Sequence, residues 1–185
     1  MTPRFLLLLG PSGVGKTTLI KLLHTIDTRF DYISPYVTRV LRSNENDKIS
    51  ITREQLLVME QRGEFLVVNR LYNVEYATPR TPILNSLVNQ RFPVLDWPIQ
   101  RIEVMTKAFP NSLFTVYVSP PSFEELRRRM AKDGRDVEPQ RLAVAKQELM
   151  EFERGDYDRY INLKVVTLDD QLEVTARYIY DNYLD

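Results

Sequence analysis

Eight consecutive residues near the N-terminus have the spacing glycine, any four residues, glycine, lysine, threonine. Glycines let such a loop curl, so that successive backbone N–H groups point inward at phosphate oxygens. Lys16 would then bridge the β- and γ-phosphates of ATP, and the Thr17 hydroxyl would ligate Mg²⁺. We therefore predict that the whole loop binds ATP with Mg²⁺: Gly10, Pro11, Ser12, Gly13, Val14, Gly15, Lys16 and Thr17.

A second candidate metal ligand ends the apolar run Val94-Leu95-Asp96. An aspartate at a strand end is the usual second contact of Mg²⁺ in sites of this kind. The same residue type also caps helices and forms turns, so the position alone leaves a structural role open. We predict Thr17 and Asp96 as the metal ligands.

The hydrophobic pattern predicts the elements that position these residues. Phe5 to Leu9 is an unbroken apolar run bounded by Gly-Pro, typical of a strand buried on both faces of a parallel sheet. Thr17 to Thr25 has helical spacing, so the glycine loop lies between a strand and a helix. Further strands are expected at Leu66–Leu71, Pro93–Asp96, Leu113–Ser119 and Leu163–Leu168, and helices at Arg53–Gln61, Ile83–Asn89, Gln100–Ala108, Ser122–Lys132, Pro139–Glu153 and Gln171–Tyr183. This alternation predicts an α/β fold of the P-loop NTPase type, with a mainly parallel sheet flanked by helices.

The composition excludes several other classes of site. The chain has no cysteine and one histidine, which excludes disulfide frameworks, thiolate zinc sites, cysteine nucleophiles and histidine metal clusters. The 25 basic and 25 acidic residues cancel, so no nucleic-acid partner is expected. The N-terminal apolar run is shorter than the roughly 7 to 15 residues of a secretory signal, and nothing approaches the length of a membrane span. We expect a cytoplasmic protein without a membrane partner.

Three motifs beside the glycine loop give the chain a resemblance to the guanylate kinase family over nearly its full length. They are Val37-Thr38-Arg39, Gly63-Glu64-Phe65 and Pro120-Pro121-Ser122-Phe123-Glu124-Glu125-Leu126, in the family's order and spacing. The resemblance implies an ATP-dependent phosphotransferase that moves the γ-phosphoryl group to a small phosphorylated acceptor such as GMP or dGMP. It also implies a single domain, residues 1–185, with a core (1–30 and 83–185), a small inserted acceptor-binding subdomain (about 31–82) and an arginine-bearing lid (about 129–146). A homodimer is one option for its assembly.

The resemblance also gives roles to side chains outside the loop. Arg39 and Arg42 match the two arginines that hold the acceptor phosphate, and a guanidinium suits this role because it pairs two oxygens and keeps its proton. Tyr76 and Thr78 match the acceptor clamp, although Ala77 replaces a glycine between them. Two lid arginines match those that reach the transferring phosphate, so the expected catalytic set is Lys16, Arg39, Arg129 and Arg141.

The chain departs from the family pattern where the guanine ring would be read. Val67 replaces a glutamate, Pro98 replaces a second carboxylate, and Lys48 aligns near a tyrosine. Asp133 replaces a lid arginine, and Pro35 a phosphate-facing serine. A valine cannot form the hydrogen bonds by which a carboxylate discriminates between bases, so these positions leave the identity of the acceptor open.

Two alternatives follow from these departures. The segment Tyr36 to Thr52 looks similar to the ribose 1,5-bisphosphate phosphokinases, which would phosphorylate a sugar phosphate. A non-catalytic guanylate-kinase-like binding module would transfer nothing, but such modules usually lose the loop lysine or its glycines, which this chain keeps. We therefore predict a Mg²⁺- and ATP-dependent kinase.

Overall fold

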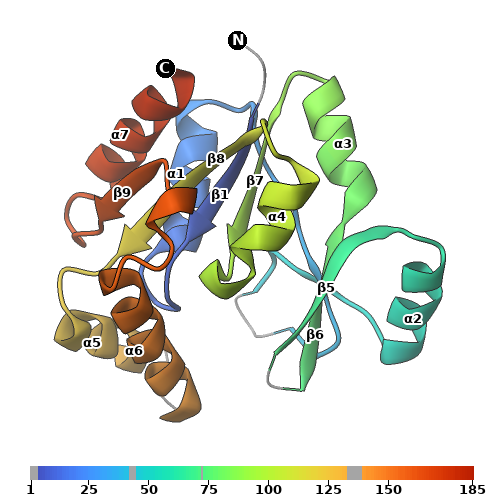
Figure 1. Ribbon diagram of the computed structural model, residues 1–185, viewed down its shortest axis with the longest axis horizontal. Helices are drawn as coiled ribbons and strands as arrows, with labels where there is room; N and C mark the ends of the chain where they lie inside the picture. Colours follow the sequence, from blue (N-terminus) through green and yellow to red (C-terminus); the bar gives the residue numbers. More distant parts are fainter. Residues whose placement is uncertain (1–3, 42–44, 72, 133–138) are drawn as a thin grey trace.

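The computed structural model describes residues 4–41, 45–71, 73–132 and 139–185, which form two β-sheets with helices around them (Figure 1). The larger sheet has five parallel strands in the order β2-β7-β1-β8-β9. These are β1 (Phe5–Leu9), β2 (Phe30–Tyr32), β7 (Phe92–Trp97), β8 (Leu113–Ser119) and β9 (Leu163–Val166). The predicted α/β fold with a mainly parallel sheet is confirmed.

Strand β1 lies at the centre of this sheet because all of its side chains are apolar and fully buried. Leu6 and Leu8 point into one core cluster, and Phe5, Leu7 and Leu9 point into another. Successive side chains of a strand face opposite sides, so both faces of β1 need an apolar partner layer. The flanking strands β7 and β8 hold its end, where Gly10 begins the glycine loop.

Helices supply both partner layers. The α-helices are α1 (Lys16–Ile26), α2 (Arg53–Gln61), α3 (Arg80–Val88), α4 (Ile102–Ala108), α5 (Phe123–Lys132), α6 (Pro139–Glu153) and α7 (Leu172–Leu184). Leu23 of α1 and Ile179 of α7 are buried in one core cluster, and Ile83 of α3 and Met105 of α4 are buried in the other. Figure 1 shows α5 and α6 at the end of the sheet opposite the N-terminus, on the side away from the smaller sheet.

The smaller sheet has four strands in the order β4-β3-β6-β5. They are β3 (Tyr36–Val37), β4 (Ile49–Ser50), β5 (Phe65–Leu71) and β6 (Val74–Pro79). Leu56 of α2 packs against Phe65 and Ala77 on one face of this sheet, which forms a separate small core. The other face is therefore turned away from α2, and it carries Tyr76 and Asn69, which lie opposite each other on neighbouring strands.

Most of the predicted elements are confirmed. Phe5–Leu9, Leu113–Ser119, Arg53–Gln61 and Pro139–Glu153 have the predicted bounds, and the Ser122 hydroxyl accepts a hydrogen bond from the backbone N–H of Glu125 at 3.1 Å, as expected for the start of α5. Strands β2, β3, β4 and β6 were not predicted, because three of them span only two or three residues and β6 mixes polar and apolar residues. Within the described residues, no helix has the length and apolar character needed to cross a bilayer.

Candidate active site

The glycine loop connects the end of β1 to the start of α1, as the sequence predicted. Gly15 is the N-cap of α1 and has φ +97°, a conformation that residues with a side chain rarely adopt. Gly10 has φ +127°, and a Cβ atom built on it would lie 2.1 Å from the carbonyl oxygen of Val118. The loop therefore turns sharply against β8 and leads directly into the N-terminus of α1, an arrangement that favours anions.

Lys16 lies across this loop. Its Nζ atom donates hydrogen bonds to the carbonyl oxygens of Gly10 and of Pro11, the latter at 2.8 Å. The ammonium group thus stays at the loop, where a triphosphate would bind. Thr17, in the first turn of α1, has an exposed side chain.

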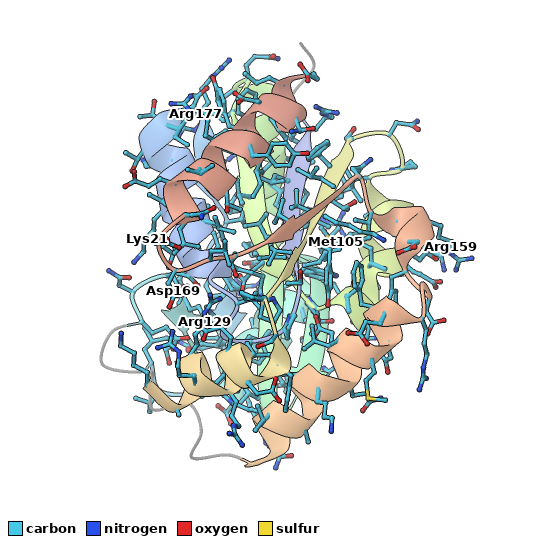
Figure 2. The ribbon with its side chains drawn as sticks, turned by 90° about the vertical axis from the view of Figure 1, so that its left-hand side faces the viewer. Lys21, Met105, Arg129, Arg159, Asp169 and Arg177 are labelled. Carbon is cyan, nitrogen blue, oxygen red and sulfur yellow. The ribbon has the colours of Figure 1, made fainter. Side chains whose placement is uncertain are left out.

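A buried threonine connects the glycine loop to the edge strand β9. Thr167 follows β9, is fully buried, and donates from Oγ1 to the carbonyl oxygen of Val14 at 2.8 Å. Arg129 of α5 in turn donates to Thr167 Oγ1 and to the Thr167 carbonyl oxygen, both at 2.9 Å. Arg129 also pairs with Asp169 at 2.8 Å and with Glu125 at 3.0 Å, and Figure 2 shows Arg129 and Asp169 next to each other. Sequence reasoning gave no role to Thr167 or Asp169.

Asp96 lies near the end of β7, beside Leu8 of the neighbouring β1. Its Oδ1 atom accepts a hydrogen bond from the Tyr32 hydroxyl at 3.1 Å. Burial, together with the charge of Asp96, raises the pKa of the Tyr32 phenol far above its usual value, so Tyr32 remains a donor. Asp96 and the exposed Thr17 supply oxygen ligands, which Mg²⁺ prefers. Mg²⁺ commonly uses one or two protein ligands and completes its shell with phosphates and water, so these residues fit the ion.

Sequence reasoning missed Glu148, which carries a buried carboxyl group in the middle of α6. Its side chain is 7% exposed, and its Oε1 atom has no hydrogen-bond partner among the described residues. Burial raises the Glu148 pKa to about 7, although the charge of Lys16 and a hydrogen bond with Gln100 act to lower it. The helix thus places a titrating group close to the lysine of the glycine loop.

The raised pKa predicts how Glu148→Gln changes stability with pH. A carboxyl group whose pKa is higher in the folded protein than in the unfolded chain stabilises the fold at low pH, and this contribution is lost as the pH rises from about 4.5 to about 7. The neutral glutamine avoids this loss, so the variant should be more stable than the wild type at pH 8, by on the order of 2 kcal/mol. The difference should vanish near pH 4. Urea denaturation between pH 4 and pH 8 measures the free energy of unfolding of both proteins. Glu124→Gln is the control, because Glu124 is exposed. A stability difference between Glu148→Gln and wild type that does not change with pH would contradict the prediction.

Three of the acceptor residues suggested by the sequence, Arg39, Tyr76 and Thr78, lie on or next to strands of the smaller sheet. Arg39 follows β3, and its guanidinium interacts with the Tyr76 phenol of β6 and pairs with the Glu45 carboxylate. Thr78 is buried on the same strand as Tyr76 and lies opposite Val67. The structure therefore brings Arg39 and Tyr76 together. Arg42 and Asp133 lie outside the described residues.

The remaining predicted residue, Arg141, is half-buried in the first turns of α6. Glu148 follows it by two helical turns, with the buried Ala145 between them, so all three lie on one face of the helix. On this face, Glu148 lies near enough to the glycine loop for the charge of Lys16 to act on its pKa.

Comparisons with known proteins agree with this geometry. The family model described as guanylate kinase matches residues 2–181. A guanylate kinase of Thermotoga maritima is 35% identical over 85% of this chain and 78% of its own length, and one of Nostoc sp. is 31% identical over 84% and 81%. The crystal structure of guanylate kinase from Anaplasma phagocytophilum superposes with a TM-score of 0.76 at 24% identity, covering 99% of this chain and 85% of that one. A shikimate kinase from Acinetobacter baumannii shares the fold, with a TM-score of 0.54 at 14% identity.

Proposed function

The chain belongs to the guanylate kinase family, and from this premise we propose that its acceptor is GMP or dGMP. The protein is a kinase that uses ATP and Mg²⁺ to phosphorylate a small phosphorylated acceptor. Neither the sugar-phosphate kinase nor the non-catalytic module is favoured, because the curated relatives are guanylate kinases. The observation that carries the proposal for the acceptor is the pairing of β3 with β6, which sets Tyr76 opposite Val37, two residues before Arg39, so that the Arg39 guanidinium interacts with the Tyr76 phenol.

We propose that the donor half of the site consists of the glycine loop, Lys16 and the metal ligands. The loop amides and the N-terminus of α1 bind the phosphates of ATP, and Lys16 exchanges its carbonyl partners for phosphate oxygens. Thr17 and Asp96 would hold Mg²⁺, which would supply positive charge to neutralise the transferring phosphoryl group. The acceptor phosphate is already anionic, so the reaction needs no protein base.

We propose that the smaller sheet and α2, within residues 31–82, form the acceptor-binding subdomain. Arg39, Arg42, Tyr76 and Thr78 hold the acceptor there, and the lid of residues 129–146 supplies Arg129 and Arg141. Arg129 pairs with Asp169 and Glu125 and bonds to Thr167, so it must exchange at least one of these partners to reach the phosphoryl group. We propose that the protein works in the cytoplasm. We also propose that it forms a homodimer, and light scattering tests this by measuring the molar mass in solution.

An acceptor panel tests the proposed function directly. A coupled assay of ADP release should show turnover with GMP and dGMP, and little with AMP, UMP, CMP or ribose 1,5-bisphosphate. Preference for the sugar phosphate or for another nucleoside monophosphate would refute the proposed acceptor. ATP binding without turnover of any acceptor would refute the kinase activity itself.

Arg39→Ala should raise the KM for GMP at least about tenfold and leave the KM for ATP nearly unchanged, because Arg39 serves the acceptor phosphate. Steady-state kinetics in both substrates measures the effect. Arg62→Ala is the matched control, since its side chain is 69% exposed on the same subdomain and pairs only loosely with Glu64, at 3.8 Å. Equal GMP constants in wild type and Arg39→Ala would place Arg39 outside the site.

A further inference from the structure

The contact between Arg39 and Glu45 uses one edge of the guanidinium completely. Arg39 Nη1 donates to Glu45 Oε2 at 2.6 Å, and Nη2 donates to Glu45 Oε1 at 2.7 Å. Nη1 also donates to the carbonyl oxygen of Val40 at 3.0 Å. Both side chains are largely buried, with 17% of Arg39 and 11% of Glu45 exposed. A two-bond pair shielded from water fixes the plane of the guanidinium as well as its position.

One donor of the same guanidinium, Nε, is buried and lacks a hydrogen-bond partner among the described residues. In a planar guanidinium the Nε–H and the outer N–H of Nη2 point the same way and form a second fork for two oxygens. The Tyr76 phenol interacts with this guanidinium from β6. A buried donor without a partner is costly, so Nε calls for an acceptor oxygen, and the geometry of the fork suits an anion such as a phosphate.

The rest of the segment holds Glu45 in place. Lys48 Nζ lies 3.7 Å from Glu45 Oε1 and 3.1 Å from Asp47 Oδ2, so the carboxylate has a cation on either side. The Ser50 hydroxyl donates to the carbonyl oxygen of Arg39 at 2.7 Å, which anchors the backbone of the arginine to β4. Glu45 is therefore part of a charge network that determines where the Arg39 guanidinium lies.

We propose that Glu45 is a positioning residue for acceptor binding: it holds one edge of Arg39 so that the Nε edge is presented to the acceptor phosphate. This rests on the proposed function of Arg39. A free arginine side chain loses conformational entropy when the acceptor binds. The pair with Glu45 already orders Arg39 before binding, so less entropy is lost at that step. The opposite arrangement, in which Glu45 occupies the place of the phosphate and must be displaced, would make Glu45 a competitor of the acceptor. The two arrangements predict changes of opposite sign.

The test compares Glu45→Ala and Glu45→Gln with the wild type, using GMP as acceptor. Positioning predicts that Glu45→Ala raises the KM and the Kd for GMP about tenfold, with the KM for ATP unchanged. Glu45→Gln, which keeps one acceptor oxygen, should show a smaller increase, and it serves as the second variant if Glu45→Ala folds poorly. In the Arg39→Ala background, Glu45→Ala should have no further effect. A lower or unchanged KM for GMP in both single variants overturns the proposal.

A second readout separates this proposal from the proposed function. The ¹⁵N signal of the Arg39 Nε–H group, assigned by its loss in Arg39→Lys, reports guanidinium order without any acceptor. It should be sharp in the wild type and broadened or shifted in Glu45→Ala, whereas an unchanged signal overturns the positioning role. Failure of the wild type to bind GMP would instead refute the proposed acceptor. Asp27→Ala is the matched control, because Asp27 pairs with Arg29 at 2.7 Å and this pair should affect neither readout.

Discussion

Lys16→Ala is expected to lower kcat for phosphoryl transfer about a thousandfold or more, while the protein stays folded. Lys16 is the only lysine of the glycine loop, and its ammonium group already lies over the loop carbonyls of Gly10 and Pro11. Phosphoryl transfer depends on positioning and on stabilising the charge of the transition state, and removing one such charge typically costs two to three orders of magnitude or more. Single-turnover kinetics with saturating GMP and ATP measures the effect on chemistry.

Lys21→Ala is the matched control for this prediction. Lys21 lies on the same helix, a little more than one turn further along, and its side chain is exposed. Figure 2 shows Lys21 on the outside of α1. Its removal should leave kcat within about twofold of the wild type, because an exposed charge away from the loop affects the transition state little. Activity of Lys16→Ala within tenfold of the wild type would refute the role assigned to Lys16.

The donor half of the candidate site was predictable because its signals are local. The run Phe5 to Leu9 is apolar at every position, and a strand covered on both faces requires that composition. The glycines follow directly, and helical spacing follows them, so one stretch of about 20 residues specifies strand, loop and helix. The structure confirms each of these elements.

The contacts that surround the loop were not predictable in the same way. Thr167 lies 153 residues from Val14, and only the pairing of β9 with β8 brings the two together. In the sequence, Thr167 is a single hydroxyl inside the predicted strand Leu163–Leu168, with nothing to distinguish it from any other polar strand residue. Glu148 likewise has the sequence context of an exposed helix residue, yet the packing of α6 buries it near Lys16.

The acceptor half shows a different limit. The resemblance pointed to Arg39, and the structure places its guanidinium beside Tyr76, but the sequence did not connect Arg39 with Glu45. The two residues are only six positions apart, yet their contact depends on the path of the segment between short strands of two residues each. Such strands carry almost no hydrophobic pattern, so their positions follow from the pairing of β3 with β6 and of β4 with β3 rather than from local sequence.

Gly10→Ala should destabilise the protein strongly, because the substituted methyl group would meet backbone rather than a side chain. The new Cβ atom would lie 2.1 Å from the carbonyl oxygen of Val118 and 3.1 Å from its carbonyl carbon. Val118 belongs to β8, which pairs with β1 over Leu113 to Tyr117 and with β9 over Val116 to Ser119, so β8 cannot move without breaking ladder hydrogen bonds. The φ of +127° adds backbone strain for any residue with a side chain. We expect the free energy of unfolding to fall by about 3 kcal/mol or more.

Gly63→Ala is the control that measures the effect of backbone strain without a steric clash. Gly63 also has a positive φ, +69°, but no atom lies within 4 Å of the Cβ position. Its substitution should therefore cost only the strain of a left-handed backbone, about 1 kcal/mol. Urea denaturation of both variants, followed by circular dichroism, measures the difference between the two losses. If the free energy of unfolding fell no more for Gly10→Ala than for Gly63→Ala, the conclusion that the loop lies in close contact with β8 would be wrong. The tight turn that directs the loop amides toward phosphate would then need another explanation, because that turn begins at Gly10.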